Sequence, residues 1–269
     1  MSNIIFKPEY IRLFIFLLGL IVFSSLEFFF PYRLRSLKRR ERWPANILMA
    51  LSANFLIKLL LPTGLIFFSL YAAEHKIGFF NNTKINPIVQ LFFSLLILDF
   101  GIYVQHIVFH KVPLFWRFHK VHHADIDLDA SSALRFHPLE IIVSLLYKGI
   151  IVIALGISVQ AVLIFEILLN FMAMFNHANI HIPKKIERLL RFFIVTPQMH
   201  IVHHSIDRKQ SDTNYGFNLS IWDKLFKTYQ AQFKNDTSIG LSYYRKASEH
   251  RFIKILFLPF KHLKQAYDD

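Results

Sequence analysis

The sequence predicts an all-α integral membrane protein, with four to five transmembrane helices and a cytosolic helical cap that carries histidine boxes. Three observations predict this class. Hydrophobic residues make up 54% of the 269 residues and charged residues only 18%, whereas average soluble chains carry about a quarter charged residues. Apolar segments long enough to span a bilayer recur along the chain. Ten of the 14 histidines fall into four short boxes.

The first half of the chain contains three of the apolar segments. The first covers residues 10–30, and a basic run from Arg33 to Arg42 follows it. The second covers residues 46–73 and is interrupted by Lys58 and Pro62, and the third covers residues 87–109. Each is long enough to cross the hydrocarbon core as a helix.

The fourth apolar segment, residues 139–175, is twice as long as one crossing needs. As a helix it extends about 55 Å, enough for two passes through about 30 Å of hydrocarbon. Gly156-Ile157-Ser158 is the natural turn between the two limbs. We therefore expect a tight helical hairpin that crosses or re-enters the membrane.

The charge distribution predicts the orientation. The net charge is +13, and basic loops favour the cytoplasmic side of a membrane. If the basic run at residues 33–42 is cytoplasmic, counting crossings places every histidine box on that same side. The positive charge is then explained by membrane topology, and we expect no nucleic-acid partner.

We expect one integral-membrane domain over residues 1–269, in three parts. Residues 1–90 form N-terminal membrane helices, residues 91–230 the histidine-box core, and residues 231–269 a C-terminal tail. Within the tail, the apolar stretch Phe252–Phe260 is too short to span and is expected to lie in the membrane interface.

The four histidine boxes predict a metal centre. Imidazole is a common ligand of zinc, iron, copper and nickel, and histidines three or four residues apart share one face of a helix. One metal takes four to six ligands, so ten ligands imply two metals. The predicted ligands are His106 and His110, His119, His122 and His123, His177 and His181, and His200, His203 and His204.

Polar residues in the apolar segments extend two of these boxes. Asp99 and Tyr103 share a helix face with His106 and His110, and we expect them to support the ligands. Glu166 and Asn170 stand in the same relation to the box at residues 177–181. An ion pair of Asp99 or Glu166 with Lys58 or Lys148 between helices is the alternative.

The remaining candidates lie beside the boxes. His137 stands at the junction of cap and membrane, where a capping, substrate-site or metal role is open, and Asn214 is a further candidate near the substrate. His75, His250 and His262 fall outside the boxes and are expected to be structural or solvated. The chain has no cysteine, so it cannot supply the thiolates of an iron–sulfur cluster or a thiolate-ligated haem.

The order and spacing of the boxes resemble the fatty acid hydroxylase/sterol desaturase superfamily of membrane oxygenases. The resemblance covers about residues 95–230, and the segments that carry it besides the boxes are Trp116–His119, Arg135–Glu140, Thr196-Pro197, Asn214-Tyr215-Gly216 and Trp222–Tyr229. Family members usually have glycine before the final Thr-Tyr, where this chain has Lys227. We expect that departure to affect a turn and not the chemistry.

The resemblance implies a di-iron site held by the ten box histidines. It further implies a reaction of O2 and two electrons with a lipid drawn from the bilayer. The electrons would come from an external soluble or membrane carrier. Hydroxylation is the favoured reaction and desaturation on the same scaffold the first alternative. A di-zinc membrane hydrolase and a non-enzymatic metal-binding protein are the more remote alternatives.

Overall fold

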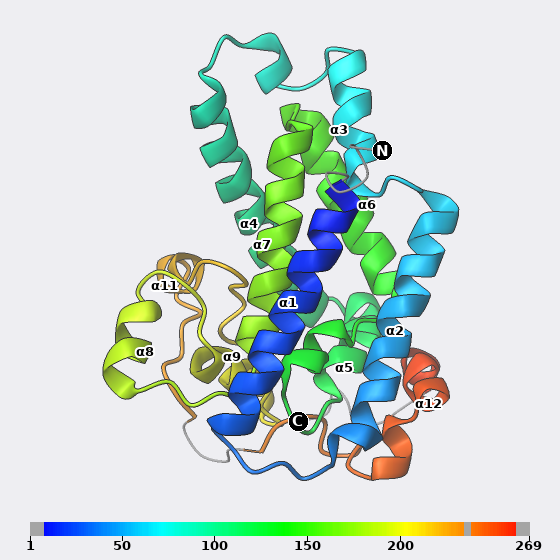
Figure 1. The fold of residues 1–269 in the computed structure, drawn as a ribbon, viewed down its shortest axis with the longest axis vertical. Helices are drawn as coiled ribbons and strands as arrows, with labels where there is room; N and C mark the ends of the chain where they lie inside the picture. The colour runs from blue at the N-terminus through cyan, green and yellow to red at the C-terminus, as the bar shows by residue number, and fades with distance from the viewer. Residues whose placement is uncertain (1–7, 234–237, 262–269) are drawn as a thin grey trace.

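The computed structural model describes residues 8–233 and 238–261, and over these residues the chain is helical with no β-strand longer than an isolated bridge. Five of its helical segments are long and apolar enough to cross a membrane. They run roughly side by side in Figure 1 and form one half of the molecule, with the shorter helices gathered at one end. The long helices are α1 (Pro8–Phe29), α2 (Arg39–Leu60) continued by α3 (Leu65–Glu74), α4 (Pro87–Lys111), α6 (Pro138–Leu155) and α7 (Val159–His177).

The expected membrane segments are confirmed, including the break in the second. Leu61 to Gly64 separate α2 from α3, because Pro62 lacks the amide hydrogen that a continuous helix needs. The predicted turn at residues 156–158 joins α6 to α7. Gly156 takes a left-handed conformation with φ of 67°, and the side chain of Ser158 caps α7 by accepting from the amide of Ala161.

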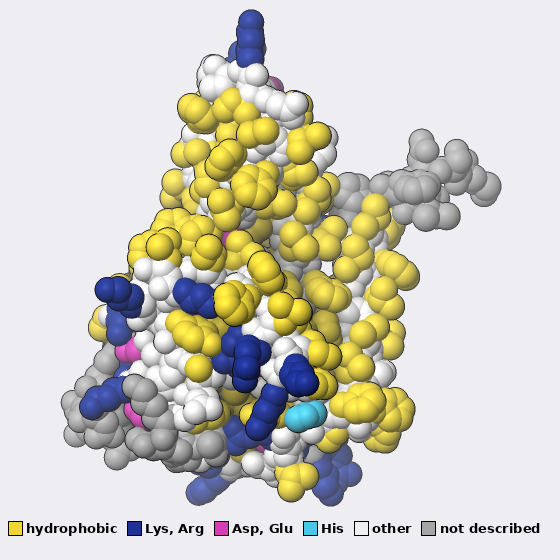
Figure 2. Space-filling view, turned by 90° about the vertical axis from the view of Figure 1, so that its left-hand side faces the viewer, with side chains coloured by type: hydrophobic (Ala, Val, Ile, Leu, Met, Phe, Trp, Pro, Cys, Tyr) yellow, Lys and Arg dark blue, Asp and Glu magenta, His cyan; other side chains and the backbone are white. Residues whose placement is uncertain are grey.

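The centre of the helical bundle is apolar and well packed. Leu98 and Ile102 of α4 contact Leu145 and Val152 of α6 and Phe165 of α7 in one buried cluster. The outer faces of the same helices expose Leu, Ile and Phe side chains, which Figure 2 shows as an extended hydrophobic surface over the upper half of the molecule. An apolar exterior around a packed interior is what a helix bundle in lipid requires.

The cap consists of short helices at the end of the bundle where α4 and α7 terminate. Its α-helices are α5 (Pro113–His123), α8 (Lys184–Leu190), α9 (Pro197–His203), α10 (Arg208–Ser211), α11 (Ile221–Leu225) and α12 (Phe252–Leu256). Single 3-10 turns are η1 (Phe80–Asn82) in a bundle loop and η2 (Ala130–Leu134), η3 (Ala247–His250) and η4 (Leu258–Phe260) in the cap. The basic segment 33–42 lies at this same end, because Arg42 contacts the loop after α5.

The apolar stretch Phe252–Phe260 is half buried. Ile255 and Leu258 pack with Met49 of α2 and Val121 of α5 in one cluster, whereas Ile253 and Phe257 are exposed. One face of the stretch therefore belongs to the core that joins α2 to the cap. Only its outer face is available for the membrane contact that the sequence predicts.

Candidate metal centre

Five buried histidines converge on one point at the base of α4. His106 and His110 come from the last turns of α4, His119 and His123 from α5, and His203 from the end of α9. One nitrogen from each side chain lies within 4.8 Å of all the others. This set has the donor type and closeness of a transition-metal site. We call it the five-histidine group.

Four further buried histidines form a second group beside the first, which we call the four-histidine group. They are His122 of α5, His177 at the end of α7, His200 of α9, and His204 immediately after α9, and their nitrogens also lie within 4.8 Å of one another. The rings of His123 and His204 stack across the two groups at a centroid distance of 4.4 Å. Two neighbouring metal sites are therefore possible, as the number of box histidines predicts.

Each three-histidine box contributes to both groups. His119 and His123 point to the five-histidine group, whereas His122 points to the other. In the last box, His200 and His204 belong together and His203 faces the opposite group. Residues four apart share a helix face, so this division follows from the helical period. The box on α5 and the box formed by α9 and His204 thereby each present histidines to both groups.

Hydrogen bonds fix which ring nitrogen of these histidines is free to bind a metal. The Nδ1 atoms of His106, His203 and His177 lie 2.7–2.8 Å from the carbonyl oxygens of Tyr215, Thr213 and Ala173 respectively. A carbonyl oxygen only accepts, so each Nδ1 carries the hydrogen. The Nε2 atom of each of these rings then carries a lone pair, as a ligand atom must.

Carboxylates contact the Nδ1 atoms of two other histidines of the five-histidine group. Nδ1 of His119 lies 2.6 Å from Oε1 of Glu140, and Nδ1 of His110 lies 3.3 Å from Oδ1 of Asp212. Both carboxylates were missed as ligand supports by the sequence reasoning. Glu140 appears there only within the motif Arg135–Glu140, since it starts a different helix 21 residues from its partner and no periodicity links them.

The resulting lone pairs face one another. Nε2 of His106 lies 3.2 Å from Nε2 of His119, and Nε2 of His177 lies 3.0 Å from that of His122 and 3.1 Å from that of His200. Nε2 of His203 is buried with no hydrogen-bond partner among the described residues. Converging lone pairs repel unless a cation lies among them, so the residues present fit a metal at each group.

The surroundings keep these rings uncharged and dry. All nine histidines of the two groups are at most 6% exposed. Burial, together with the nearby Arg208 guanidinium, lowers the pKa of His119 to about 3, and burial among other histidines lowers the pKa of His123, His200 and His204 well below the usual value. The neutral form, which is the form that binds metal, therefore persists to acidic pH.

His181 does not join either group, and its predicted role as a ligand needs correction. Helix α7 ends at His177, and Ala178 is extended with φ of −62° and ψ of 132°. The rule that residues four apart share a face therefore stops applying before His181. Its side chain is exposed and stacks on Tyr32 at a centroid distance of 6.4 Å.

Asp99 and Tyr103 of α4 are buried, but their side chains contact the cap and not the histidines that they were expected to support. The carboxylate of Asp99 accepts from the amides of Asn218 and Leu219 and from the indole of Trp222 at 2.8 Å. The Tyr103 hydroxyl is 2.9 Å from that of Thr228. Both residues thus tie the segment after α10 to the helix that carries His106 and His110.

The corresponding polar face predicted on α7 is not formed. Glu166 pairs with Arg12 of α1 at 3.0 Å, so it is an interhelical ion pair, although with neither of the lysines considered from the sequence. Asn170 is exposed and donates to the carbonyl of Glu166 in its own helix. Neither residue reaches the histidines.

His137 and Asn214 have structural contacts. The Nδ1 atom of His137 caps α6 by accepting from the amide of Leu139, and its Nε2 lies 3.2 Å from the carbonyl of Leu256. Asn214 is buried with φ of 52°, and its side chain holds the chain between Met199 and Gln230. It therefore shapes the turn that presents Thr213 and Tyr215 to His203 and His106.

Three histidines were expected to be structural or solvated. His75 is exposed, with Nδ1 2.9 Å from the carbonyl of Tyr71. His250 is fully buried, with Nδ1 3.2 Å from a guanidinium nitrogen of Arg135. His262 lies outside the described residues.

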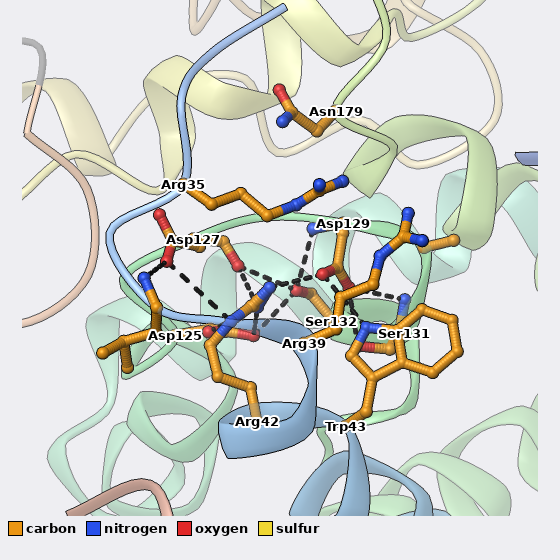
Figure 3. Close-up of polar contacts among 12 residues, drawn as sticks. Arg35, Arg39, Arg42, Trp43, Asp125, Asp127, Asp129, Ser131, Ser132 and Asn179 are labelled. Atoms are coloured by element: carbon orange, nitrogen blue, oxygen red, sulfur yellow. Dashed lines mark hydrogen bonds and ion pairs between the residues drawn. The ribbon is translucent and has the colours of Figure 1, made fainter. Parts of the chain in front are cut away.

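A buried ionic network fixes the loop that follows α5. Figure 3 shows the guanidinium of Arg42 among the carboxylates of Asp125, Asp127 and Asp129. Arg42 donates to both oxygens of Asp125 at 2.9 Å, and its positive charge, with that of Arg135, holds the pKa of Asp125 far below its usual range despite burial. Asp125 follows His123 by two residues, so the network anchors the end of the second box to α2.

Comparison with known proteins decides the family. The model of the family described as "Fatty acid hydroxylase" matches residues 91–228, which are 138 of the 269 residues. The chain belongs to the fatty acid hydroxylase family. Every box histidine lies within the matched range, as do Glu140 and Asp212.

The curated proteins that this chain resembles include several lipid hydroxylases. Ornithine lipid hydroxylase OlsE of Rhizobium tropici is 30% identical over 57% of this chain and 46% of its own length. Human alkylglycerol monooxygenase is 35% identical over 50% of this chain and 29% of its own length. Human cholesterol 25-hydroxylase is 27% identical over 52% of this chain and 50% of its own length. The chain thus spans half or less of these relatives, and no solved structure matches it.

The departure from the family pattern at Lys227 does affect a turn. Lys227 has φ of 60°, a left-handed conformation in which glycine is favoured. It lies just after α11, on the exposed side, and neither histidine group includes a neighbouring residue. The lysine therefore makes this left-handed turn less favourable than glycine would, but it belongs to neither histidine group.

Proposed function

We propose that the protein is a membrane-bound di-iron oxygenase that hydroxylates a lipid with O2 and externally supplied electrons. The observation that carries the proposal is the convergence of nine buried imidazoles in two adjacent groups, with the tautomer of several fixed so that Nε2 faces inward. When bound there, two irons supply the oxidising power that amino-acid side chains lack for cleaving an aliphatic C–H bond.

The residues of this chain have three tasks in such a reaction. The nine histidines of the two groups hold the metals. Glu140 and Asp212 keep His119 and His110 in the ligating tautomer. The burial of all nine rings excludes water from the site, which prevents side reactions of the activated oxygen. In this proposal, His181 has none of these tasks.

The position of the groups supports a lipid substrate. His106 and His110 lie in the last turns of α4, and His177 is the last residue of α7. Both groups therefore lie at the cap-side ends of two apolar helices. A lipid chain in the bilayer needs to move only along its own length to bring one carbon to such a site. Relatives named as hydroxylases or monooxygenases of lipids favour hydroxylation over desaturation and over the di-zinc hydrolase.

We further propose that the site faces the cytoplasm and receives electrons from a separate carrier. The basic segment 33–42 lies at the same end as the histidine groups, and the positive-inside rule assigns that end to the cytoplasm. The absence of cysteine from these 269 residues means that no iron–sulfur cluster within them delivers the electrons.

The test is reductant-driven oxidation of membrane lipids by the purified, iron-loaded protein under ¹⁸O2. Hydroxylation predicts lipid products that gain one ¹⁸O atom, in wild type but not in His203→Ala. Products that lose two hydrogens without gaining oxygen would identify a desaturase. Lipid turnover that needs neither O2 nor reductant would contradict the oxygenase.

A further inference from the structure

An exposed apolar surface lies on the cap outside the transmembrane helices. It is formed by α8 and the segment that follows it as far as Phe193, and by α11 with the residue after it. The side chains are between 49% and 68% exposed, and they are Ile186, Leu189, Phe192, Phe193, Leu225 and Phe226. We call this surface the cap patch. Contiguous apolar surfaces of this kind mark an interaction site.

Among the described residues, the exposed charged side chains on α8, and on α11 with the two residues after it, are all positive. Lys184, Lys185 and Arg188 on α8, and Lys224 and Lys227 at α11, are exposed. The acidic residues of these helices point inward. Glu187 accepts from Arg191 at 2.7 Å and from Thr196 at 2.6 Å, and buried Asp223 accepts from the amides of Tyr215 and Gly216. The outward face of these two helices, as far as the described residues go, therefore combines aromatic and aliphatic side chains with positively charged ones.

The cap patch adjoins the exposed apolar faces of the long helices, which we call the apolar belt. Phe226 packs on Phe100 of α4 at a centroid distance of 5.7 Å, and Trp222 on the same ring at 5.0 Å. Helix α4 has 25 residues, about 37 Å, which exceeds the hydrocarbon core by about a turn. Figure 2 shows the Lys and Arg side chains, interleaved with hydrophobic ones, directly beneath the apolar belt.

We propose that the cap patch lies in the cap-side interface of the bilayer and binds anionic lipid headgroups there. At the boundary between acyl chains and headgroups, the Phe, Leu and Ile side chains can contact the acyl chains while the neighbouring Lys and Arg side chains contact the headgroups. The positive rim matches an anionic leaflet. Continuity with the apolar belt makes the bilayer, and not a soluble protein, the occupant of this surface.

Contact of the cap patch with the bilayer would also stabilise the position of the fourth histidine box. Thr196, the N-cap of α9, donates to Glu187 of α8, and the amide of Val195 donates to Asn218 just before α11 at 3.0 Å. The segment that carries His200 and His203 is thus held between the two halves of the cap patch. The inference does not depend on the oxygenase activity.

Depth measurements on the full-length protein in vesicles test the inference directly. Because the chain has no cysteine, Phe193→Cys and Leu225→Cys each give one site for an environment-sensitive fluorophore. Lys209→Cys is the matched control, since exposed Lys209 lies on α10, beside the end of α4. The vesicles contain phosphatidylcholine with phosphatidylglycerol, and brominated acyl chains serve as quencher.

We expect bromolipid to quench the fluorophores at 193 and 225 several-fold more than the fluorophore at 209. Equal quenching at all three sites would overturn the interfacial position. So would fluorophores at 193 and 225 that are shielded from an aqueous quencher yet untouched by bromolipid, because a protein would then cover the patch. Retained metal content in each variant shows that the fold is intact.

Headgroup binding needs a second comparison. In pure phosphatidylcholine we expect the fluorophore at 193 to lie shallower than with phosphatidylglycerol present. Changing Lys184, Lys185 and Arg188 to Gln in the F193C chain should remove that difference. A depth that responds neither to phosphatidylglycerol nor to these substitutions would overturn the anionic-lipid part of the proposal and leave an apolar contact only.

Discussion

The Nε2 atoms of His106 and His119 lie 3.2 Å apart, while the Nδ1 atoms of both rings face oxygen acceptors on the opposite side. Two neutral imidazoles oriented in this way present lone pairs to each other. Facing lone pairs repel, and a cation bound between them removes that repulsion, so the contacts of the two rings with Tyr215 and Glu140 favour metal binding.

Glu140 is expected to control metal affinity without being a ligand. Glu140→Ala removes the acceptor that holds His119, and loss of such a partner typically lowers metal affinity about 10- to 100-fold. Competition with a chelator of known affinity measures the change. Glu140→Gln, which keeps an acceptor oxygen, should lose less, and equal affinity in wild type and the Ala variant would contradict this role.

The two histidines of the third box should behave differently. His177→Ala removes a ligand of the four-histidine group and should lower the metal content by about one ion per chain, since four ligands make a minimal site. His181→Ala is the matched control and should retain full metal, because its side chain is exposed. Elemental analysis of the two purified variants makes the comparison, and an equal loss in both would restore His181 as a ligand.

Arg42 is expected to be essential for stability. Arg42→Met leaves the carboxylates around it buried without their main counter-charge, and breaking a buried ion pair in this way costs about 3–5 kcal/mol. Thermal unfolding in detergent measures the loss. Arg40→Met, at an exposed position on the same turn, should change stability little. Similar midpoints for the two variants would show that the network is dispensable.

His250 should make the fold sensitive to mild acid. Burial and the Arg135 guanidinium lower its pKa to about 4 in the folded protein, whereas unfolded histidine has a pKa of about 6.5. Between these values the unfolded chain takes up a proton that the folded chain does not, so stability falls as pH decreases from 6.5 toward 4, by up to about 1.4 kcal/mol per pH unit.

The matched variant for that pH dependence is His250→Asn, whose side-chain oxygen still accepts from Arg135. Its stability should fall less steeply than that of wild type across the same interval. Unfolding midpoints between pH 7.5 and 4.5 provide the two slopes. Identical slopes would mean that His250 does not contribute, since the other histidines are common to both proteins.

Local periodicity predicted the parts of the site that lie on unbroken helices. Asp99, Tyr103, His106 and His110 share a buried face because α4 continues without interruption to Lys111. The same rule failed at His181 because α7 ends four residues earlier. The glycine turn at residue 156 was equally predictable, since its signal is contained in the residues of the turn.

Contacts between distant segments were not predictable in this way. Arg42 and Asp125 are 83 residues apart, and His119 and Glu140 are 21 residues apart on different helices. No helical period connects such pairs, and a carboxylate after a histidine box has many possible partners. The division of each three-histidine box between two groups also required the packing of α5 against α9 and the end of α7.

The assignment of two metals to the histidine groups is tested by the number of metal ions per chain in protein purified in detergent after expression with ample iron. We expect close to two irons per chain in wild type and about one in His177→Ala, which leaves only three histidines in the four-histidine group. A wild-type protein that binds no metal, or a His177→Ala variant that retains the full wild-type content, would contradict the assignment of two metals.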